Sequence, residues 1–269
     1  MKALPFAGAA LAALLVLSPA AQAHKRWLLP SHTVVSDTQW ITVDTSASND
    51  IFYVDMPFPL AGLQVTGPDG KEAEVDNRLE GHRRSVFDVN LNQQGSYRVT
   101  LFRPLYVSLY QLDGERHHQR GQSPEALLKE VPEGATEVRI SEVISRLETF
   151  ATVGAPSDKA LTPTGKGLEL QALTHPNDLY QGETARFRFL VDGEPVSGLE
   201  VEVMPAGTRY RDSQNAWTVT SDENGEVSLE WPQAGRYYLE ANHADDRAEH
   251  DKADGRRLQY MATFEVLPL

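Results

Sequence analysis

The chain has 269 residues, a formal net charge of −13 at pH 7, 41% hydrophobic residues and no cysteine. The hydrophobic content supports a packed core and excludes a wholly disordered chain, while the lack of cysteine excludes disulfides and cysteine nucleophiles. The acidic balance argues against nucleic acid or anionic lipid as a partner.

Residues 1–23 are predicted to form a secretory signal peptide. Met1-Lys2 gives a short basic start, Ala7 to Leu17 is an apolar run, and Ala21-Gln22-Ala23 has the small-x-small pattern of a cleavage site. No later run is long enough to cross a bilayer. We therefore expect a periplasmic protein whose mature chain begins at His24, with no direct membrane insertion after cleavage.

The region 24–154 has the pattern of a β-sandwich domain. Trp40 to Thr45 alternates apolar and polar residues as a half-buried strand does, and Gly67-Pro68-Asp69-Gly70 predicts a tight turn. One helix is predicted over Ser123 to Lys129, which has a serine at the N-cap and a proline in the first turn. Val138 to Phe150 fits either a helical stripe or a strand, and its second half favours a strand.

The stretch 155–167 is rich in proline, threonine, glycine and serine and is predicted to link two domains. The region 168–269 then contains several alternating runs separated by turns. Asp222-Glu223-Asn224-Gly225 is one such turn, in which Gly225 is free to adopt a positive φ. We expect an all-β protein with two tandem antiparallel β-sandwich domains, Ig-like or transthyretin-like, over 24–154 and 168–269.

His24 is the sharpest candidate metal ligand. Cleavage after Ala23 would place a free α-amino group beside the imidazole, and these two nitrogens can chelate one ion such as Cu(II), Ni(II) or Co(II). A complete site needs one more histidine or carboxylate from elsewhere in the chain. The alternative is that His24 is only a solvated terminus.

Four other histidines are candidates for the further ligand. Two bracket an acidic loop that follows a strand, one is close to His24 in sequence, and one has a second histidine beside it. The loop mixes acidic and basic residues, which is typical of a solvated segment, and adjacent histidines in a strand point to opposite faces. The four candidates are His32, His117, His243 and His250.

The sequence contains none of the familiar catalytic motifs. There is no Gly-x-Ser-x-Gly elbow, no phosphate-binding glycine-rich loop and no His-Glu-x-x-His helix. A glycosidase pair could be hidden among the 38 acidic residues, but nothing singles out two of them. We predict that the protein is not an enzyme, the alternative being a copper redox enzyme that uses His24. His175, which precedes Pro176, is expected to cap or pack the start of a strand.

Several segments together resemble one periplasmic family. They are AHKRWLLP at the start of the mature chain, GSYRVTLF, TSDENGEVSLEWPQAGRYYLEANH and the final YMATFEVLPL. In this order they are similar to the periplasmic family called domain of unknown function 4198, which is itself similar to NikM-like proteins. The resemblance implies a component of cobalt or nickel uptake, and the second half resembles a transthyretin-like or carboxypeptidase-regulatory-like β module.

These observations predict a periplasmic binding protein for a divalent transition metal, Ni, Co or Cu, acting as an accessory to uptake or homeostasis. A membrane transporter component would then be its partner. The alternative is a structural or interaction module that binds a protein or a glycan through sheet edges, loops and exposed aromatic residues. Trp217, Tyr210 and Tyr237 are the aromatic residues expected to be exposed.

Overall fold

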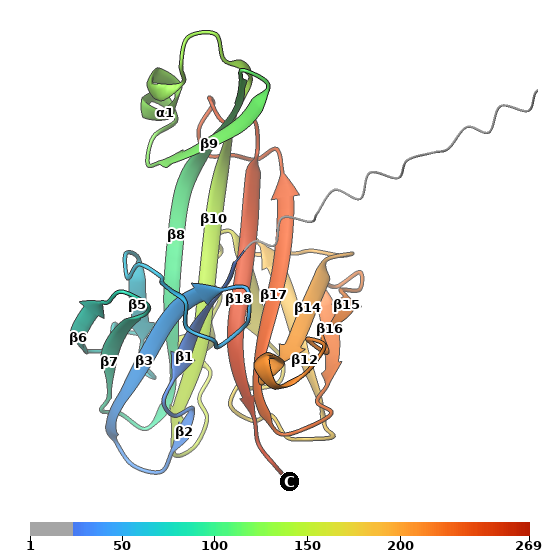
Figure 1. Cartoon of the computed structure of the whole chain (residues 1–269). Coiled ribbons are helices and arrows are strands. Elements are labelled where there is room, and N and C mark those ends of the chain that lie inside the picture. Colours follow the sequence, from blue (N-terminus) through green and yellow to red (C-terminus); the bar gives the residue numbers. More distant parts are fainter. Residues whose placement is uncertain (1–23) are drawn as a thin grey trace, which may run out of the picture.

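The computed structural model describes residues 24–269, so the predicted signal peptide and its cleavage site lie outside the described residues. The described chain is almost entirely β-strand, arranged in three sheets with a projection at one end (Figure 1). The expected all-β fold class is confirmed. No helix in the described part has the length and apolar character needed to cross a membrane.

The first sheet comes entirely from the N-terminal half of the chain. Its strands run in the order β1-β3-β7-β6, with the short β4 added to β3, and all of these neighbours are antiparallel. The strands are β1 (Lys25–Pro30), β3 (Gln39–Ser48), β4 (Met56–Pro57), β6 (Val75–Glu80) and β7 (Ser85–Leu91).

The middle sheet combines strands from both halves in the order β15-β14-β17-β18-β10-β8-β5, with β2 on β10 and β9 on β8. Its pairings are antiparallel except where β10 meets β18 and β2, which run parallel to it. The strands are β2 (Val34–Val35), β5 (Leu63–Thr66), β8 (Gly95–Leu112), β9 (Glu115–Gly121), β10 (Thr136–Val153), β14 (Glu200–Pro205), β15 (Trp217–Thr220), β17 (Gly235–Asp245) and β18 (Arg256–Val266).

The third sheet comes from the C-terminal half. It has the order β11-β12-β13, and β16 also pairs with β12. Its strands are β11 (Leu168–Ala172), β12 (Thr184–Val191), β13 (Glu194–Pro195) and β16 (Glu226–Glu230). The described helical elements are α1 (Pro124–Glu130) and the single 3-10 turns η1 (Lys159–Leu161) and η2 (Thr208–Tyr210).

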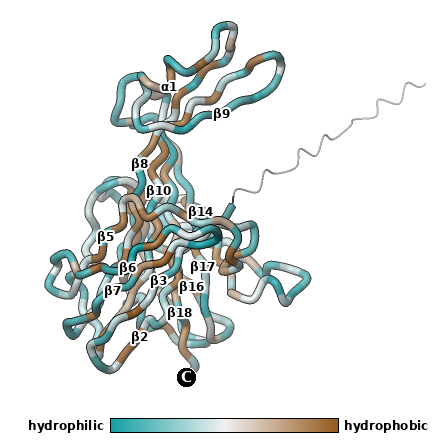
Figure 2. Tube along the Cα trace, turned by 60° about the vertical axis from the view of Figure 1, so that its left-hand side comes forward, coloured by the Kyte–Doolittle hydropathy of each residue, from teal (hydrophilic) through white to brown (hydrophobic). Residues whose placement is uncertain are grey.

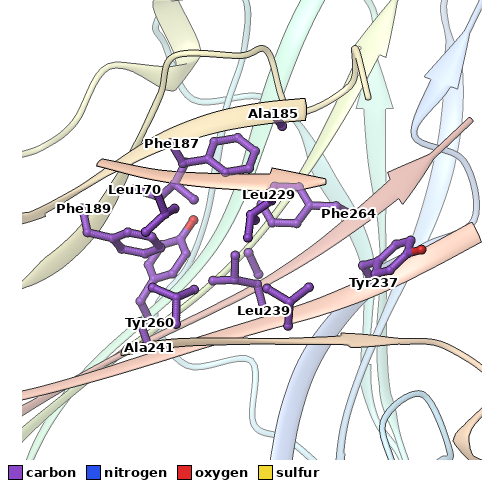
Figure 3. Close-up of a cluster of buried hydrophobic side chains, with 14 of the residues drawn as sticks. Leu170, Ala185, Phe187, Phe189, Leu229, Tyr237, Leu239, Ala241, Tyr260 and Phe264 are labelled. Carbon is purple, nitrogen blue, oxygen red and sulfur yellow. The ribbon is translucent and has the colours of Figure 1, made fainter. Parts of the chain in front are cut away.

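Within the body, the middle sheet is buried on both faces because its side chains alternate between two separate cores. Tyr238 and Met261 belong to the core shared with the first sheet, whereas their neighbours Leu239 and Tyr260 belong to the core shared with the third. In the second core Phe187 stacks on Phe264 with ring centroids 5.3 Å apart (Figure 3). The body is therefore a sandwich on each side of one common sheet.

The two halves are joined by hydrogen bonds as well as by the chain. β10 lies in 24–154 and β18 lies in 168–269, yet they pair in parallel from Glu142 opposite Arg256 to Thr149 opposite Thr263. The predicted linker 155–167 is packed rather than extended, since η1 places Leu161 in the core under the third sheet. The division into two domains stays a prediction, but the halves share a sheet.

Several local predictions are confirmed. Ser123 caps α1 by accepting a hydrogen bond from the Ala126 N–H. Gly225 has φ 73°, and a Cβ there would lie 2.6 Å from the Phe189 carbonyl oxygen, so both the turn and the close approach require glycine. The ambiguous stretch Val138 to Phe150 is strand throughout: it is paired with β8, and its second half is buried in the body.

One prediction about exposed aromatic residues is wrong. Tyr237 is fully buried, with its hydroxyl donating to the Gln233 carbonyl at 2.7 Å. Trp217 is partly buried and packs edge-on against Tyr237. Tyr210 is exposed as expected. The tyrosine lies on the inner face of β17, which the alternation alone does not distinguish from the outer face when a strand is buried on both sides.

Candidate functional site

The most distinctive feature of the surface is a projection at one end of the middle sheet. β8 and β10 continue past the other strands and carry β9 and α1 at their ends (Figures 1 and 2). We call residues 105–143 the arm. No residue of the arm belongs to either of the two hydrophobic cores in the described chain. The body can therefore be formed without the arm's side chains.

One face of the arm is covered. Leu127 of α1 packs so closely on β9 that a Cβ at Gly121 would lie 3.1 Å from its Cγ. The loop 246–255 lies along β10, where the Ile140 N–H donates to the Asp254 carboxylate at 2.8 Å. The Glu249 N–H donates to the Glu142 carboxylate at 2.9 Å. Helix and loop together shield this face, and Ile140 beneath them is buried.

Electrostatic contacts fix the covering elements to each other. His250 Nε2 lies 2.9 Å from a Glu125 carboxylate oxygen, and Lys252 Nζ lies 3.3 Å from the same oxygen. Hydrogen bonds from its own backbone N–H and from Ser123, followed by those from Lys252 and the charge of His250, lower the pKa of Glu125 to about 2. Glu125 is thus ionised at neutral pH and attracts the loop to α1.

The opposite face of the arm has no such cover. The strand registers place Val107 opposite Arg120 of β9 and Leu109 opposite Arg139 of β10. Paired residues share a face, so the aliphatic side chains of β8 lie beside a basic row on β9 and beside the single Arg139 of β10. Val107 and Leu109 are only partly buried, although they lie in the middle strand of the arm. We call this surface the open face.

The N-terminal segment is anchored below the open face. Lys25 Nζ lies 2.5 Å from a Glu202 oxygen and 2.9 Å from a Glu240 oxygen. Arg26 donates to Gln259 at 3.0 Å and to Ser145 at 3.3 Å. Burial opposes the ionisation of Glu240, but the charge of Lys25 and the hydrogen bonds from Lys25, Asn242 and Tyr238 together outweigh it and lower the pKa of Glu240. β1 is thus fixed to the middle sheet through its first two residues.

The histidines predicted as metal ligands lie far apart. His24 is exposed at the start of β1. His32 lies beyond the other end of that strand, about 20 Å away at the usual rise of an extended chain, and contacts Ser31 Oγ at 3.1 Å. His243 is on the other face of β17 from Glu240, because odd and even residues of a strand alternate.

The remaining two candidates lie on the covered side of the arm. His117 stacks on Tyr110 with ring centroids 5.4 Å apart, and His250 packs edge-on against Tyr106 at 6.2 Å. The two carboxylates near His250 contact different ring nitrogens, so they cannot join it around one ion. Across residues 24–269, no three histidine or carboxylate side chains are grouped closely enough to hold a metal. The five predicted ligands therefore do not form a common site.

Sequence reasoning missed the open face. Arg103, Arg120, Arg139 and Arg257 are spread over 155 positions and look like isolated surface charges in the sequence. The visible signal is the alternation of basic residues at Arg116, His118 and Arg120. Only the register of four strands shows that these residues share one face.

Three solved structures illustrate what the chain is similar to. The D0-D1 domain of Intimin is 12% identical with a TM-score of 0.22, covering 89% of this chain and 97% of that one. The Escherichia coli adhesin FdeC is 13% identical with a TM-score of 0.22, covering 88% and 65%. Salmonella alpha-2-macroglobulin is 12% identical with a TM-score of 0.26, covering 89% and 14%. At such TM-scores these similarities carry no argument about function.

No curated protein matches the sequence. A family profile does match: the one described as Domain of unknown function (DUF4198) aligns with residues 21–245, which is most of the chain. The role in nickel or cobalt uptake and the transthyretin-like module remain predictions. The chain belongs to the DUF4198 family.

Proposed function

We propose that this protein is a non-catalytic binding module of the periplasm that contacts a partner macromolecule through the open face of its arm. The observation that carries the proposal is the asymmetry of the arm. Its covered face is shielded by α1 and the loop 246–255, whereas its other face presents partly buried aliphatic residues beside basic ones. Mixed apolar and arginine surfaces are typical of protein interfaces.

Site-specific photo-crosslinking in cells that produce the protein tests this proposal. A photoreactive amino acid is introduced at Val107 on the open face, at Leu128 of α1 on the covered side, or at Leu79 on the body. Leu128 and Leu79 are matched controls because their side chains are 40% and 60% exposed. We expect a discrete adduct from Val107 and none of comparable yield from the other two positions.

Adducts of equal yield from all three positions would show random collision and would contradict the proposal. A partner that crosslinks only from Leu79 would place the contact surface on the first sheet instead of the arm.

The second candidate function is metal binding at a processed N-terminus, and one observation favours it. The two residues after His24 are each fixed to the middle sheet, Lys25 by Glu202 and Glu240 and Arg26 by Gln259 and Ser145. A mature chain beginning at His24 would therefore hold its α-amine and imidazole in a limited space. This proposal does not use His32, His117, His243 or His250.

Calorimetry with Ni²⁺, Co²⁺ and Cu²⁺ tests the second candidate on protein that begins at His24. We expect binding that is lost in His24→Ala and also in a protein with two extra residues before His24, since the extension converts the amine to an amide. His32→Ala is the matched control and should bind as the parent does. Equal binding by the extended protein would eliminate the terminal chelate.

A further inference from the structure

Six arginines gather on the open face and at its base. Arg103 of β8 is opposite Ser145 of β10, which is opposite Gln259 of β18, and Arg26 donates to both of these residues. Continuing along the same strands, every second residue lies on the same face. This alternation and the strand registers place six arginines on the open face or at its base: Arg26, Arg103, Arg116, Arg120, Arg139 and Arg257.

In residues 24–269, none of these six arginines has a carboxylate oxygen within 4.0 Å of its guanidinium nitrogens. Every ion pair at that distance is formed by another cation. The chain as a whole has a net charge of −13, so carboxylates are not scarce. A hollow of about 380 Å³ at the arm is lined by Arg116, Arg139 and Arg257 together with Glu137, and also by Tyr110 and His117 from the covered side. The Glu137 carboxylate accepts a hydrogen bond from Gln111 at 2.6 Å.

The cations are also close to one another at the base of the arm. Arg26 and Arg103 both lie over the ring of Phe58, at 5.8 Å and 5.0 Å from its centroid. Burial lowers the pKa of Arg103, and the charges of Arg26 and Arg120 lower it further against the opposing charge of Glu80. The three guanidinium groups therefore repel one another where a bound anion would relieve the repulsion.

We propose that the open face binds an acidic, extended peptide segment of a partner protein. The inference rests on the proposed function and names the chemistry of its partner. Arg116, His118 and Arg120 alternate along β9 with a spacing of about 7 Å, which is the spacing of alternate side chains in an extended peptide. Val107 and Leu109 of β8 lie beside this row, where they can contact apolar residues that alternate with the carboxylates of the peptide.

A peptide fits this surface better than a long polyanion does. A nucleic acid or an anionic membrane extends past the arm and is repelled by the rest of the protein, because the chain has a net charge of −13. A short peptide contacts only the basic residues of the open face. Aliphatic side chains beside the basic row of β9 would add nothing to the recognition of a phosphate backbone.

Fluorescence polarisation with the full mature chain tests the inference. The probe is a labelled octapeptide of alternating Glu and Leu, and the control probe alternates Lys and Leu. We expect saturable binding of the acidic probe alone, weakened by added salt. The variant Arg120→Glu/Arg139→Glu should bind at least about tenfold more weakly because two attractive charges become repulsive.

The matched control is Arg78→Glu/Arg209→Glu, which makes the same change of net charge at two exposed arginines of the body. It should change the affinity less than about twofold. Circular dichroism melting curves establish that both double variants are folded.

Four results would overturn the inference: no binding of the acidic probe, an equal loss in the control variant, tighter binding of a single-stranded oligonucleotide or an anionic vesicle, or a dimer that the Arg120→Glu/Arg139→Glu change dissociates. The last result would make a second copy the occupant. If crosslinking from Val107 succeeds while the probe fails to bind, the proposed function stands and only the acidic partner is wrong.

Discussion

At the scale of single residues, the strongest constraint is a buried charge cluster between the middle sheet and the segment before β11. Arg146 lies 3.4 Å from Glu148 and 3.3 Å from Glu169, and all three side chains are at least 96% buried. Glu148 also accepts a hydrogen bond from Tyr260 at 2.8 Å. Glu169 accepts from the backbone N–H groups of Thr164, Gly165 and Lys166, which holds the packed segment against the sheet.

Removing Arg146 from this cluster should be costly, because the remaining cation, Arg98, lies 3.9 Å from Glu148 and has no ion pair with Glu169. In Arg146→Met two carboxylates stay buried without their shared partner, and we expect the free energy of unfolding in urea to fall by about 3–5 kcal/mol. The control is Arg188→Met, whose pair with Glu226 has an arginine side chain 30% exposed. That variant should lose about 1 kcal/mol or less. Equal losses would show that the Arg146 cluster is no more important than a surface pair.

The surroundings of His175 lead to a second prediction, which concerns how the stability of the fold depends on pH. Its Nδ1 accepts the Asn177 N–H at 3.1 Å, so its proton is on Nε2, which donates to the buried Ser96 hydroxyl at 2.8 Å. This confirms the packing role expected for His175. Burial lowers its pKa in the folded state below the ordinary value of about 6.5. The folded state therefore binds a proton at His175 less readily than the unfolded state does. As a result, the contribution of neutral His175 to the free energy of unfolding is complete above pH 6.5.

That contribution is lost as the pH falls from 6.5 through the lowered folded pKa. We expect the free energy of unfolding to decrease from pH 7.5 to pH 5 in the parent, and to decrease less in His175→Gln, which lacks the titrating group. The substitution should reduce the slope of the unfolding free energy against pH by up to about 1.4 kcal/mol per pH unit. Urea titrations at four pH values measure it. Parallel pH profiles for the two proteins would eliminate His175 as the cause.

At the scale of elements, β10 connects the two halves of the molecule. It pairs with β8 over almost its whole length, and on its other edge with β18 over eight residue pairs. Leu147 of β10 packs in the first core and Phe150 in the second. A separated C-terminal half would expose the edge of β18 and the inner side of its core, so the two halves should stabilise each other.

A single chain break tests this interdependence. A protease site inserted between the exposed residues 155 and 156 gives a nicked protein in which only non-covalent contacts join the halves. We expect the two fragments to elute together in gel filtration and to separate only in denaturant, with one cooperative unfolding transition. Fragments that separate in buffer and unfold independently would instead confirm two self-sufficient domains.

At the scale of the whole molecule, sequence patterns predict elements better than their assembly. The α1 cap, the turn at Gly225 and the strand at Trp40 follow from neighbouring residues, and each is confirmed. The pairing of β10 with β18 joins residues more than a hundred positions apart, and no local pattern indicates it. For the same reason the orientation of Tyr237 could not be predicted, since both faces of its strand are buried.

The candidate site was harder to predict than the fold. Histidines attract attention in a sequence because they can bind metal, but the strands place His32, His117 and His250 in separate contacts with Ser31, Tyr110 and Glu125. The open face depends on strand register alone. Its arginines are ordinary in sequence and become a site only when four strands bring them to one surface.

The separation of arm and body leads to a final prediction. Val107 of β8 is directly opposite Ser141 of β10, so an Asn-Gly turn can replace 108–140 and close a shorter hairpin. Both hydrophobic cores remain complete in this variant, because neither contains an arm residue. The main loss is support for the loop 246–255, which contacts Ile140 and Glu125. We therefore expect one cooperative melting transition with Tm lowered by no more than about 5 °C.

The same deletion should remove the crosslinked partner and the binding of the acidic probe, since it eliminates Arg116, Arg120 and Arg139 together. Differential scanning calorimetry and fluorescence polarisation on the same preparation measure the two effects. A variant that melts far below the parent would show that the arm supports the body's fold, which would contradict its assignment as a projection specialised for binding. A stable variant that still binds the probe would place the anion site on the body, at Arg26, Arg103 and Arg257.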